Sequence, residues 1–182
     1  TDYVLDGTQT RPYSEEALPH PLGVYGETKL KGEQHIQHIL GPTQDFLIVR
    51  TAWLYGRHGK NFVTAIVQRA QQQDTLRVVN DQTGSPTYTK DLARGIIALL
   101  RHNAAGIVHV TNSGRCTWYE FANTILDYAG LSHVTVIPIT TEELQRPAPR
   151  PKFSVLDTTK FSVLTGQKIQ HWKQGLQEYF SE

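Results

Sequence analysis

The stretch Tyr25-Gly26-Glu27-Thr28-Lys29 decides how this sequence of 182 residues is interpreted. If the residues from Val24 onward are helical, Tyr25 and Lys29 lie one turn apart on the same face, so the lysine ammonium can lie beside the tyrosine phenol. A nearby cation lowers the pKa of a tyrosine from its reference of about 10 and makes the phenol a usable proton donor near neutral pH. Carbonyl reduction needs such a group. Because a Tyr-x-x-x-Lys match also arises by chance, the surrounding sequence has to support it.

Five further segments accompany this motif. They are Thr1-Asp2-Tyr3-Val4-Leu5-Asp6-Gly7, Pro12-Tyr13-Ser14-Glu15-Glu16, Val49-Arg50-Thr51-Ala52-Trp53-Leu54-Tyr55-Gly56, Asn80-Asp81-Gln82-Thr83-Gly84-Ser85-Pro86-Thr87 and Arg150-Pro151-Lys152-Phe153-Ser154-Val155-Leu156-Asp157. Together they resemble the extended short-chain dehydrogenase/reductase family, and within it most closely the dTDP-4-dehydrorhamnose reductases. The resemblance covers nearly the whole chain. It implies an α/β fold, namely the C-terminal portion of a Rossmann-like reductase with its smaller substrate-binding α/β region.

The glycine-rich turn that opens enzymes of this family does not occur in the sequence. Family members begin with a strand, a turn of the Gly-x-x-Gly-x-x-Gly kind and a helix, which together hold the dinucleotide pyrophosphate. The sequence also contains no methionine. We therefore expect residues 1–182 to be the C-terminal part of a longer reductase, with the N-terminal nucleotide-binding half missing.

The composition is that of a globular domain. Hydrophobic residues make up 38% and charged residues 19% of the chain, within the usual range for one domain. The net charge of +1 shows no basic surplus of the kind that marks a nucleic-acid binder. No apolar run approaches membrane-spanning length, and no signal peptide opens the chain. Cys116 is the only cysteine, which fits a reducing compartment. We expect a cytoplasmic protein that binds neither nucleic acid nor membrane.

Apolar spacing and boundary residues predict alternating helices and strands. Helices are expected from 24 to about 40, over 62–70 with Asn61 as its cap, over 90–101, from 117 to 130 and across 172–180. Strands are expected over 46–49, 76–79, 107–110 and 134–137, the first of them buried on both faces of a parallel sheet. Thr117 with Glu120, and Thr140 with Glu143, match the capping box. The proline-rich residues 146–151 are expected to be extended.

The resemblance implies catalytic roles for Tyr25, Lys29 and Thr1. Tyr25 would donate a proton to the substrate carbonyl, Lys29 would lower the pKa of that phenol and hold the nicotinamide ribose, and Thr1 would orient the carbonyl. The cofactor would be NADPH or NADH, and its pyrophosphate and adenosine would bind residues outside this chain. The alternative for Tyr25 and Lys29 is a helix-surface pair worth a few tenths of a kcal/mol.

The substrate would be a dTDP-sugar. The family uses the segment with Asp2 and Tyr3 to line the sugar pocket, although packing at the end of a strand is the alternative for both. Trp53 follows an apolar strand, where ligands collect in open α/β sheets. Its indole can stack on a pyranose or a base, and the alternative is a place in the core. The remaining residues expected in this pocket are Asn61, Gly84, Ser85, Thr87 and Arg150.

An arginine is the natural partner of a diphosphate, because its fork binds oxygens in pairs. We expect Arg150 to take this role. Arg50, Arg57 and Arg146 compete for it, and the sequence does not choose among them.

The residues themselves predict no metal site. His35 and His38 share a helical face, but the sequence has no His-Glu-x-x-His motif and no cysteine partner for them, so a solvated face is the better interpretation. Cys116 is interpreted as a small packing residue. Some family members bind magnesium at a carboxylate-lined subunit contact, so the resemblance alone leaves Mg²⁺ and a homodimer open.

Two other classes of function remain open. A related sugar-nucleotide epimerase or dehydratase is disfavoured because many epimerases carry Arg-x-x-Asn where this chain has the Trp53 segment. A non-catalytic regulatory subunit is the second alternative, because one eukaryotic relative of these reductases serves methionine adenosyltransferase in that way. The presence of Tyr25 and Lys29 favours an enzyme.

Overall fold

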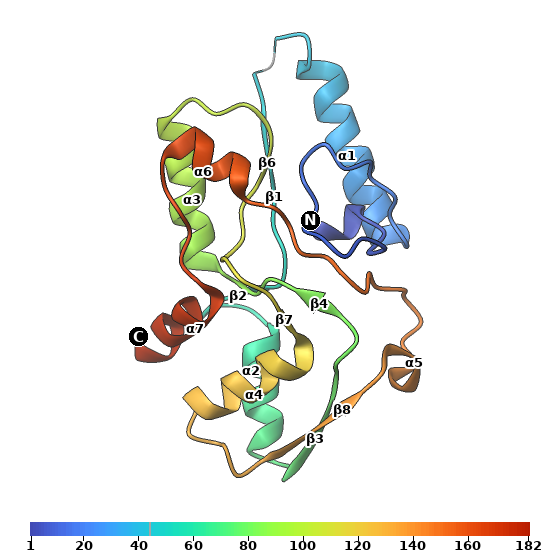
Figure 1. Ribbon diagram of the computed structural model, residues 1–182, viewed down its shortest axis with the longest axis vertical. Coiled ribbons are helices and arrows are strands. Elements are labelled where there is room, and N and C mark those ends of the chain that lie inside the picture. Colours follow the sequence, from blue (N-terminus) through green and yellow to red (C-terminus); the bar gives the residue numbers. More distant parts are fainter. Residues whose placement is uncertain (44) are drawn as a thin grey trace.

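The computed structural model describes residues 1–43 and 45–182 (Figure 1). The helices are η1 (Asp2–Val4, a 3-10 turn), α1 (Val24–Leu40), α2 (Phe62–Ala70), α3 (Thr89–Arg101), α4 (Trp118–Tyr128), α5 (Thr141–Leu144), α6 (Thr159–Thr165) and α7 (Trp172–Ser181). The strands are β1 (Leu47–Arg50), β2 (Leu54–Tyr55), β3 (Thr75–Val79), β4 (Thr83–Gly84), β5 (Thr87–Tyr88), β6 (Gly106–His109), β7 (Cys116–Thr117) and β8 (Thr135–Ile139). No helix in the described ranges is long and apolar enough to cross a bilayer.

The strands associate in pairs, most of them parallel. β1 pairs with β6, β2 with β5 and β3 with β8, all in parallel, whereas β4 and β7 are antiparallel. Ile48 lies opposite Ile107 in the first pair, and Val78 lies opposite Pro138 in the third. Parallel strands need crossover connections, which the helices between them supply. The result is a mixed α/β fold, as expected.

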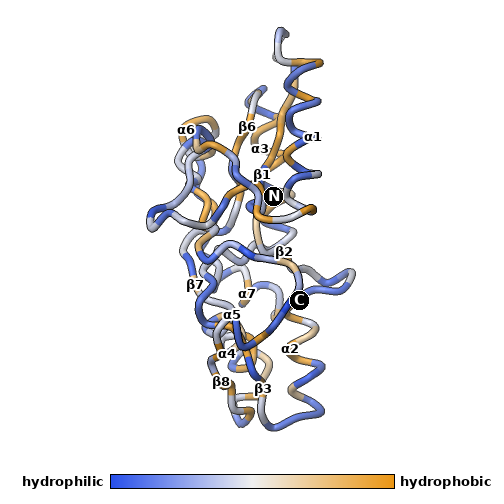
Figure 2. The backbone as a smooth tube through the Cα atoms, turned by 90° about the vertical axis from the view of Figure 1, so that its right-hand side faces the viewer, coloured by the Kyte–Doolittle hydropathy of each residue, from blue (hydrophilic) through white to orange (hydrophobic). Residues whose placement is uncertain are grey.

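Three apolar clusters hold these elements together. The largest lies where α2 and α4 pack against each other and against β3, and where α7 packs against α4 and β5. It includes Phe121, Ile125 and Leu176. The second includes Leu99 and Phe161, and fills the space between α3, α6 and β6. Figure 2 shows the apolar segments of β1 and β6 side by side. The third cluster surrounds Val4, Leu5, Tyr13 and Leu156, and packs the N-terminal segment against the chain beyond the proline-rich stretch.

The expected elements are present with small differences at their ends. Both predicted capping boxes form, because Thr117 accepts a hydrogen bond from the Glu120 amide at 3.1 Å and Thr140 accepts one from the Glu143 amide at 3.2 Å. Asn61 caps α2 as predicted. Helix α6 and the two-residue strands were not predicted, because segments this short carry too little periodicity.

The expectation that residues 46–49 are buried on both faces was wrong. Leu47 to Val49 are only partly buried, and the buried residue of β1 is Arg50. Within the described residues β1 has one paired neighbour, β6, so part of its surface stays open. Residues 146–151 form neither helix nor strand and bend at 147 and 148, so they are not uniformly extended. We call residues 146–151 the proline strap.

Candidate active site

Tyr25 and Lys29 lie in the first two turns of α1, on one face of the helix. The Lys29 Nζ atom is 5.6 Å from the centroid of the Tyr25 ring, as the spacing predicted. The Tyr25 and Tyr3 rings form an edge-to-face contact, with 5.8 Å between the ring centroids and 88° between the ring planes. Gly26 allows this close approach, because a Cβ atom there would lie 2.2 Å from the Tyr3 carbonyl oxygen. The start of α1 is therefore held directly against η1.

A cavity of about 330 Å³ joins this pair to the N-terminal segment and the chain beyond β1. We call it the tyrosine hollow; it is lined by Thr1, Asp2, Tyr25, Lys29, Thr51, Ala52, Trp53 and Leu54. The Asp2 amide donates to the Thr51 carbonyl oxygen at 3.1 Å, which ties η1 to the residue that follows β1. The fold thus brings all three expected catalytic residues together with two of the expected substrate-binding residues.

Asp2 is the buried acid of the tyrosine hollow. Thr1 Oγ1 donates to Asp2 Oδ1 at 3.2 Å, whereas Asp2 Oδ2 has no hydrogen-bond partner in the described part of the chain. Burial raises the pKa of Asp2 to about 6. A buried acceptor without a partner is costly, so it is available to a ligand hydroxyl.

Two further hollows lie along the proline strap. The strap hollow, about 560 Å³, runs between the residues that open α1 and the strap, and includes Tyr3, Tyr25 and Arg150. The arginine hollow, about 180 Å³, is lined by Phe62, Ile66, Arg69, Arg77, Val78, Val79, Gln82, Trp118, Leu144, Arg146 and Arg150. Tyr25 belongs to both the tyrosine and the strap hollows, and Arg150 to both the strap and the arginine hollows. The strap hollow therefore lies between Tyr25 and the arginines that line the arginine hollow.

The tertiary structure separates the four arginines that the sequence left open. Arg50 is 1% exposed and its Nη2 atom lies 2.6 Å from Glu33 Oε2, so its charge is already paired inside the fold. Arg57 lies outside the three hollows, whereas Arg146 and Arg150 line the arginine hollow.

Arg69 and Arg77 also line the arginine hollow, and our sequence reasoning missed both. Arg69 follows Phe62 by seven residues and Ile66 by three, which places all three on one helical face. Arg77 alternates with buried neighbours along β3. These spacings assign Arg69 to one face of its helix and Arg77 to one face of its strand. They do not show that the two faces meet.

Trp53 lines the tyrosine hollow and also packs against the largest core cluster. Its indole stacks on Trp118, with 3.4 Å between ring centroids and 6° between planes. Gly84 lies against the same indole, because a Cβ atom on Gly84 would be 2.4 Å from Trp53 Cε2. Trp118 therefore already covers one face of the ring that was expected to stack on a ligand.

Gly84 and three further expected pocket residues lie outside the three hollows, and the polar groups of the three further residues hold loops. Asn61 Nδ2 donates to the Gly56 carbonyl oxygen at 2.8 Å while its Oδ1 caps α2. Ser85 Oγ donates to the Gly114 carbonyl oxygen at 2.8 Å, and Thr87 Oγ1 donates to the Ser85 carbonyl oxygen at 3.2 Å. We leave these three residues out of the candidate site.

No group of three or more His, Cys, Asp or Glu side chains in residues 1–43 and 45–182 could hold a metal ion. His35 and His38 are exposed on α1, in agreement with a solvated face. Cys116 is buried in the largest cluster, and burial raises the pKa of its thiol.

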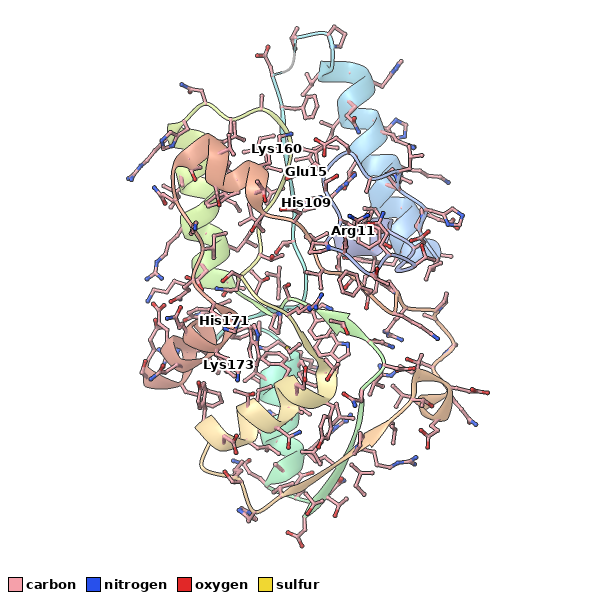
Figure 3. All side chains as sticks on the ribbon, viewed as in Figure 1. Arg11, Glu15, His109, Lys160, His171 and Lys173 are labelled. Atoms are coloured by element: carbon pink, nitrogen blue, oxygen red, sulfur yellow. The ribbon has the colours of Figure 1, made fainter. Side chains whose placement is uncertain are left out.

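His109 is a buried titratable group beside the Arg50–Glu33 pair. It is fully buried at the end of β6, and its amide donates to Glu15 Oε1 at 2.9 Å (Figure 3). Burial, with a smaller contribution from the Arg50 charge, lowers the pKa of His109 to about 4. The imidazole is therefore neutral near neutral pH.

We compared the chain with models of protein families and with known proteins. The family model of the RmlD substrate binding domain matches residues 1–182. The spore coat polysaccharide biosynthesis protein SpsK of Bacillus subtilis (strain 168) is 44% identical over 182 residues, which cover 100% of this chain and 62% of that protein.

Two solved dTDP-4-dehydrorhamnose reductases share the fold. The enzyme from Clostridium acetobutylicum is 43% identical with a TM-score of 0.91, over 99% of this chain and 62% of that one. The enzyme from Bacillus anthracis, solved in complex with NADP, is 37% identical with a TM-score of 0.94, over 99% of this chain and 63% of that one. The chain spans less than two thirds of the length of these relatives. Because the family model matches its whole length, the chain belongs to the RmlD substrate binding domain family.

Proposed function

We propose that this chain supplies the substrate site and the proton donor of a dTDP-4-dehydrorhamnose reductase, which reduces the C4 carbonyl of dTDP-4-dehydro-L-rhamnose with NADPH or NADH. The observation that carries the proposal is the tyrosine hollow, where the Tyr25–Lys29 pair shares one cavity with Thr1 and Asp2. The names of the two solved relatives support the substrate, and the NADP complex of one of them supports the cofactor class.

Tyr25 donates the proton to the carbonyl oxygen in this proposal. Tyr25 is 54% exposed and lines the tyrosine hollow, so a substrate can reach it. The Lys29 ammonium beside the ring stabilises the phenolate that remains after proton transfer. When substrate binds, the Thr1 hydroxyl turns from Asp2 Oδ1, to which it donates in the structure, and donates to the same carbonyl oxygen instead. Asp2 Oδ2 accepts a hydrogen bond from a sugar hydroxyl, which gives that buried oxygen its partner.

The diphosphate binds in the arginine hollow. Arg146 and Arg150 line this hollow from the proline strap. Arg69 lines it from α2 and Arg77 from β3. Each guanidinium group can bind two phosphate oxygens at once. A diphosphate is therefore bound better by arginines than by an ammonium group, which acts as a point charge.

The residues of this chain fit one end of a dinucleotide. When bound, NADPH or NADH would supply the hydride for the C4 carbon. Lys29 and Tyr25 can hold the nicotinamide ribose, because the ammonium can donate to a ribose hydroxyl while the phenol oxygen accepts a hydrogen bond from one. The sequence has no glycine-rich turn, so we assign no pyrophosphate site to it.

A chimera tests the proposal. The matching segment of the Clostridium acetobutylicum reductase is replaced by this chain, and NADPH oxidation is followed with dTDP-4-dehydrorhamnose. We expect an active chimera in which Tyr25→Phe lowers turnover by about two to four orders of magnitude while substrate binding changes little, because only the hydroxyl is lost.

Tyr128→Phe is the matched control, because Tyr128 lies on α4, outside the three hollows, and loses the same hydroxyl. Near-normal turnover of the Tyr25→Phe chimera would show that another group donates the proton. A folded chimera that binds dTDP but never oxidises NADPH would favour the non-catalytic alternative.

A further inference from the structure

The stacked indoles of Trp53 and Trp118 connect two hollows. Trp53 lines the tyrosine hollow and Trp118 lines the arginine hollow, and their rings are 3.4 Å apart and nearly parallel. Trp53 has a φ of 46°, a left-handed conformation that bulky residues rarely adopt. Such a conformation persists only when the surroundings hold it. The Thr87 amide donates to the Trp53 carbonyl oxygen at 3.1 Å, and the stack on Trp118 holds the Trp53 side chain.

A chain of hydrogen bonds fixes Trp118 in turn. Trp118 Nε1 donates to Gln82 Oε1 at 3.2 Å, and Gln82 Nε2 donates to Thr141 Oγ1 at 2.9 Å. Thr141 Oγ1 donates to Asp81 Oδ1 at 2.7 Å. Gln82 is 4% exposed, so water does not compete strongly for its amide. Thr141 begins α5, which leads into the proline strap, so the plane of the Trp118 ring is tied to the root of the strap.

We propose that Trp118 is a positioning residue for the sugar: it sets the plane of the Trp53 indole beside the tyrosine hollow, and Gln82 holds Trp118 in that orientation. The inference rests on the proposed function in one respect, namely that the tyrosine hollow receives the sugar of a dTDP-sugar. Trp118 does not line that hollow. Its effect on sugar binding is therefore transmitted through Trp53.

The geometry is tested first, without ligand. Stacked indoles couple their electronic transitions, and they give an exciton couplet in circular dichroism when the in-plane axes of the two rings are twisted relative to each other. The chain has only three tryptophans, so few signals overlap. We expect a couplet that disappears in Trp53→Leu and in Trp118→Leu, weakens in Gln82→Met and survives in Trp172→Phe. Survival of the couplet in Trp118→Leu would overturn the proposal.

Binding is tested by calorimetric titration of the chain with dTDP and with dTDP-L-rhamnose. The ratio of the two affinities measures the contribution of the sugar and cancels any direct effect of Trp118 on the nucleotide. We expect Trp118→Leu to reduce this ratio by about tenfold, as Trp53→Leu does, since one stacked ring contributes a factor of this order. The double variant should lose no more than either single variant, because both changes remove the same contact.

Tyr119→Leu is the matched control, because Tyr119 is the neighbouring aromatic residue of α4 and lines none of the three hollows. Its ratio should equal that of the wild type. If Trp118→Leu fails to fold, Gln82→Met replaces it in the same titrations. Suppose that the affinity ratio is unchanged in Trp118→Leu or Gln82→Met but reduced in Trp53→Leu. That result would overturn the positioning role and leave the proposed function standing. Additive losses of affinity ratio in the double variant would do the same. A wild-type chain that binds neither compound would overturn both.

Discussion

Gly84 shows how one residue decides the shape of the site. The position needs no special backbone conformation, but it has no room for a side chain, because a Cβ atom would lie 2.4 Å from Trp53 Cε2. We expect Gly84→Ala to displace the Trp53 indole and weaken binding of dTDP-L-rhamnose by about tenfold, with a smaller effect on dTDP. Calorimetry on both compounds measures this.

Gly32→Ala is the control for that substitution. Gly32 lies inside α1 with nothing within 4 Å of its would-be Cβ atom. Alanine there should leave both affinities unchanged and raise the free energy of unfolding by about 0.5–1 kcal/mol, because glycine is a poor helix former. Equal affinities in both glycine variants and the wild type would show that the Trp53 indole can move without consequence for the sugar.

The titration of one residue, Asp2, makes the stability of the fold depend on pH. Because burial raises the pKa of Asp2 to about 6 from its ordinary value of 3.8, the folded state binds the proton more tightly than the unfolded state does. Stability from this group is therefore full below pH 3.8 and is lost as the pH rises through about 6, a change on the order of 3 kcal/mol. We expect Asp2→Asn to raise the melting temperature at pH 8 relative to wild type and to weaken binding of dTDP-L-rhamnose. A lower melting temperature at pH 8 would mean that the carboxylate is satisfied in the fold.

At the scale of elements, one buried ion pair joins α1 to β1. Arg50 donates to both carboxylate oxygens of Glu33, through Nε at 3.0 and 3.1 Å and through Nη2 at 2.6 Å. We expect Glu33→Gln to lower the free energy of unfolding by about 3–5 kcal/mol, because it leaves the Arg50 charge buried without a counter-ion. Urea denaturation measures the loss.

The control for this pair is Glu27→Gln on the same helix, where the side chain is exposed and the effect should be within about 0.5 kcal/mol. Replacing both Glu33 and Arg50 by leucine should recover much of the loss, because an apolar pair needs no counter-ion. If the single and double variants were equally unstable, packing of the two elements would matter more than the charge.

At the scale of the whole molecule, the chain carries a cluster of arginines but no glycine-rich turn. We expect it to bind dTDP measurably and to bind NADPH more weakly than the low micromolar range, because a pyrophosphate site contributes most of the energy of dinucleotide binding. The dTDP affinity should fall with added salt and in Arg77→Gln. A low micromolar dissociation constant for NADPH would show that the chain holds a dinucleotide without such a turn.

The sequence by itself determined the features that depend on neighbours along the chain. The Tyr25 and Lys29 side chains meet because four residues make about one helical turn, and the caps at Thr117 and Thr140 form because each needs only the residue three positions on. The α/β class followed from the alternation of such local patterns. The motifs also indicated the family correctly.

Only the tertiary structure decided which side chains from distant segments meet. It paired Arg50 with Glu33, gathered the arginine hollow from α2, β3 and the proline strap, and stacked Trp118 on Trp53. No local pattern encodes these contacts, because each depends on how two surfaces pack, and an arginine on a surface has the same neighbours in sequence whether it faces water or a ligand. Spacing along the chain specifies elements, whereas the composition of a site depends on the packing of those elements against one another.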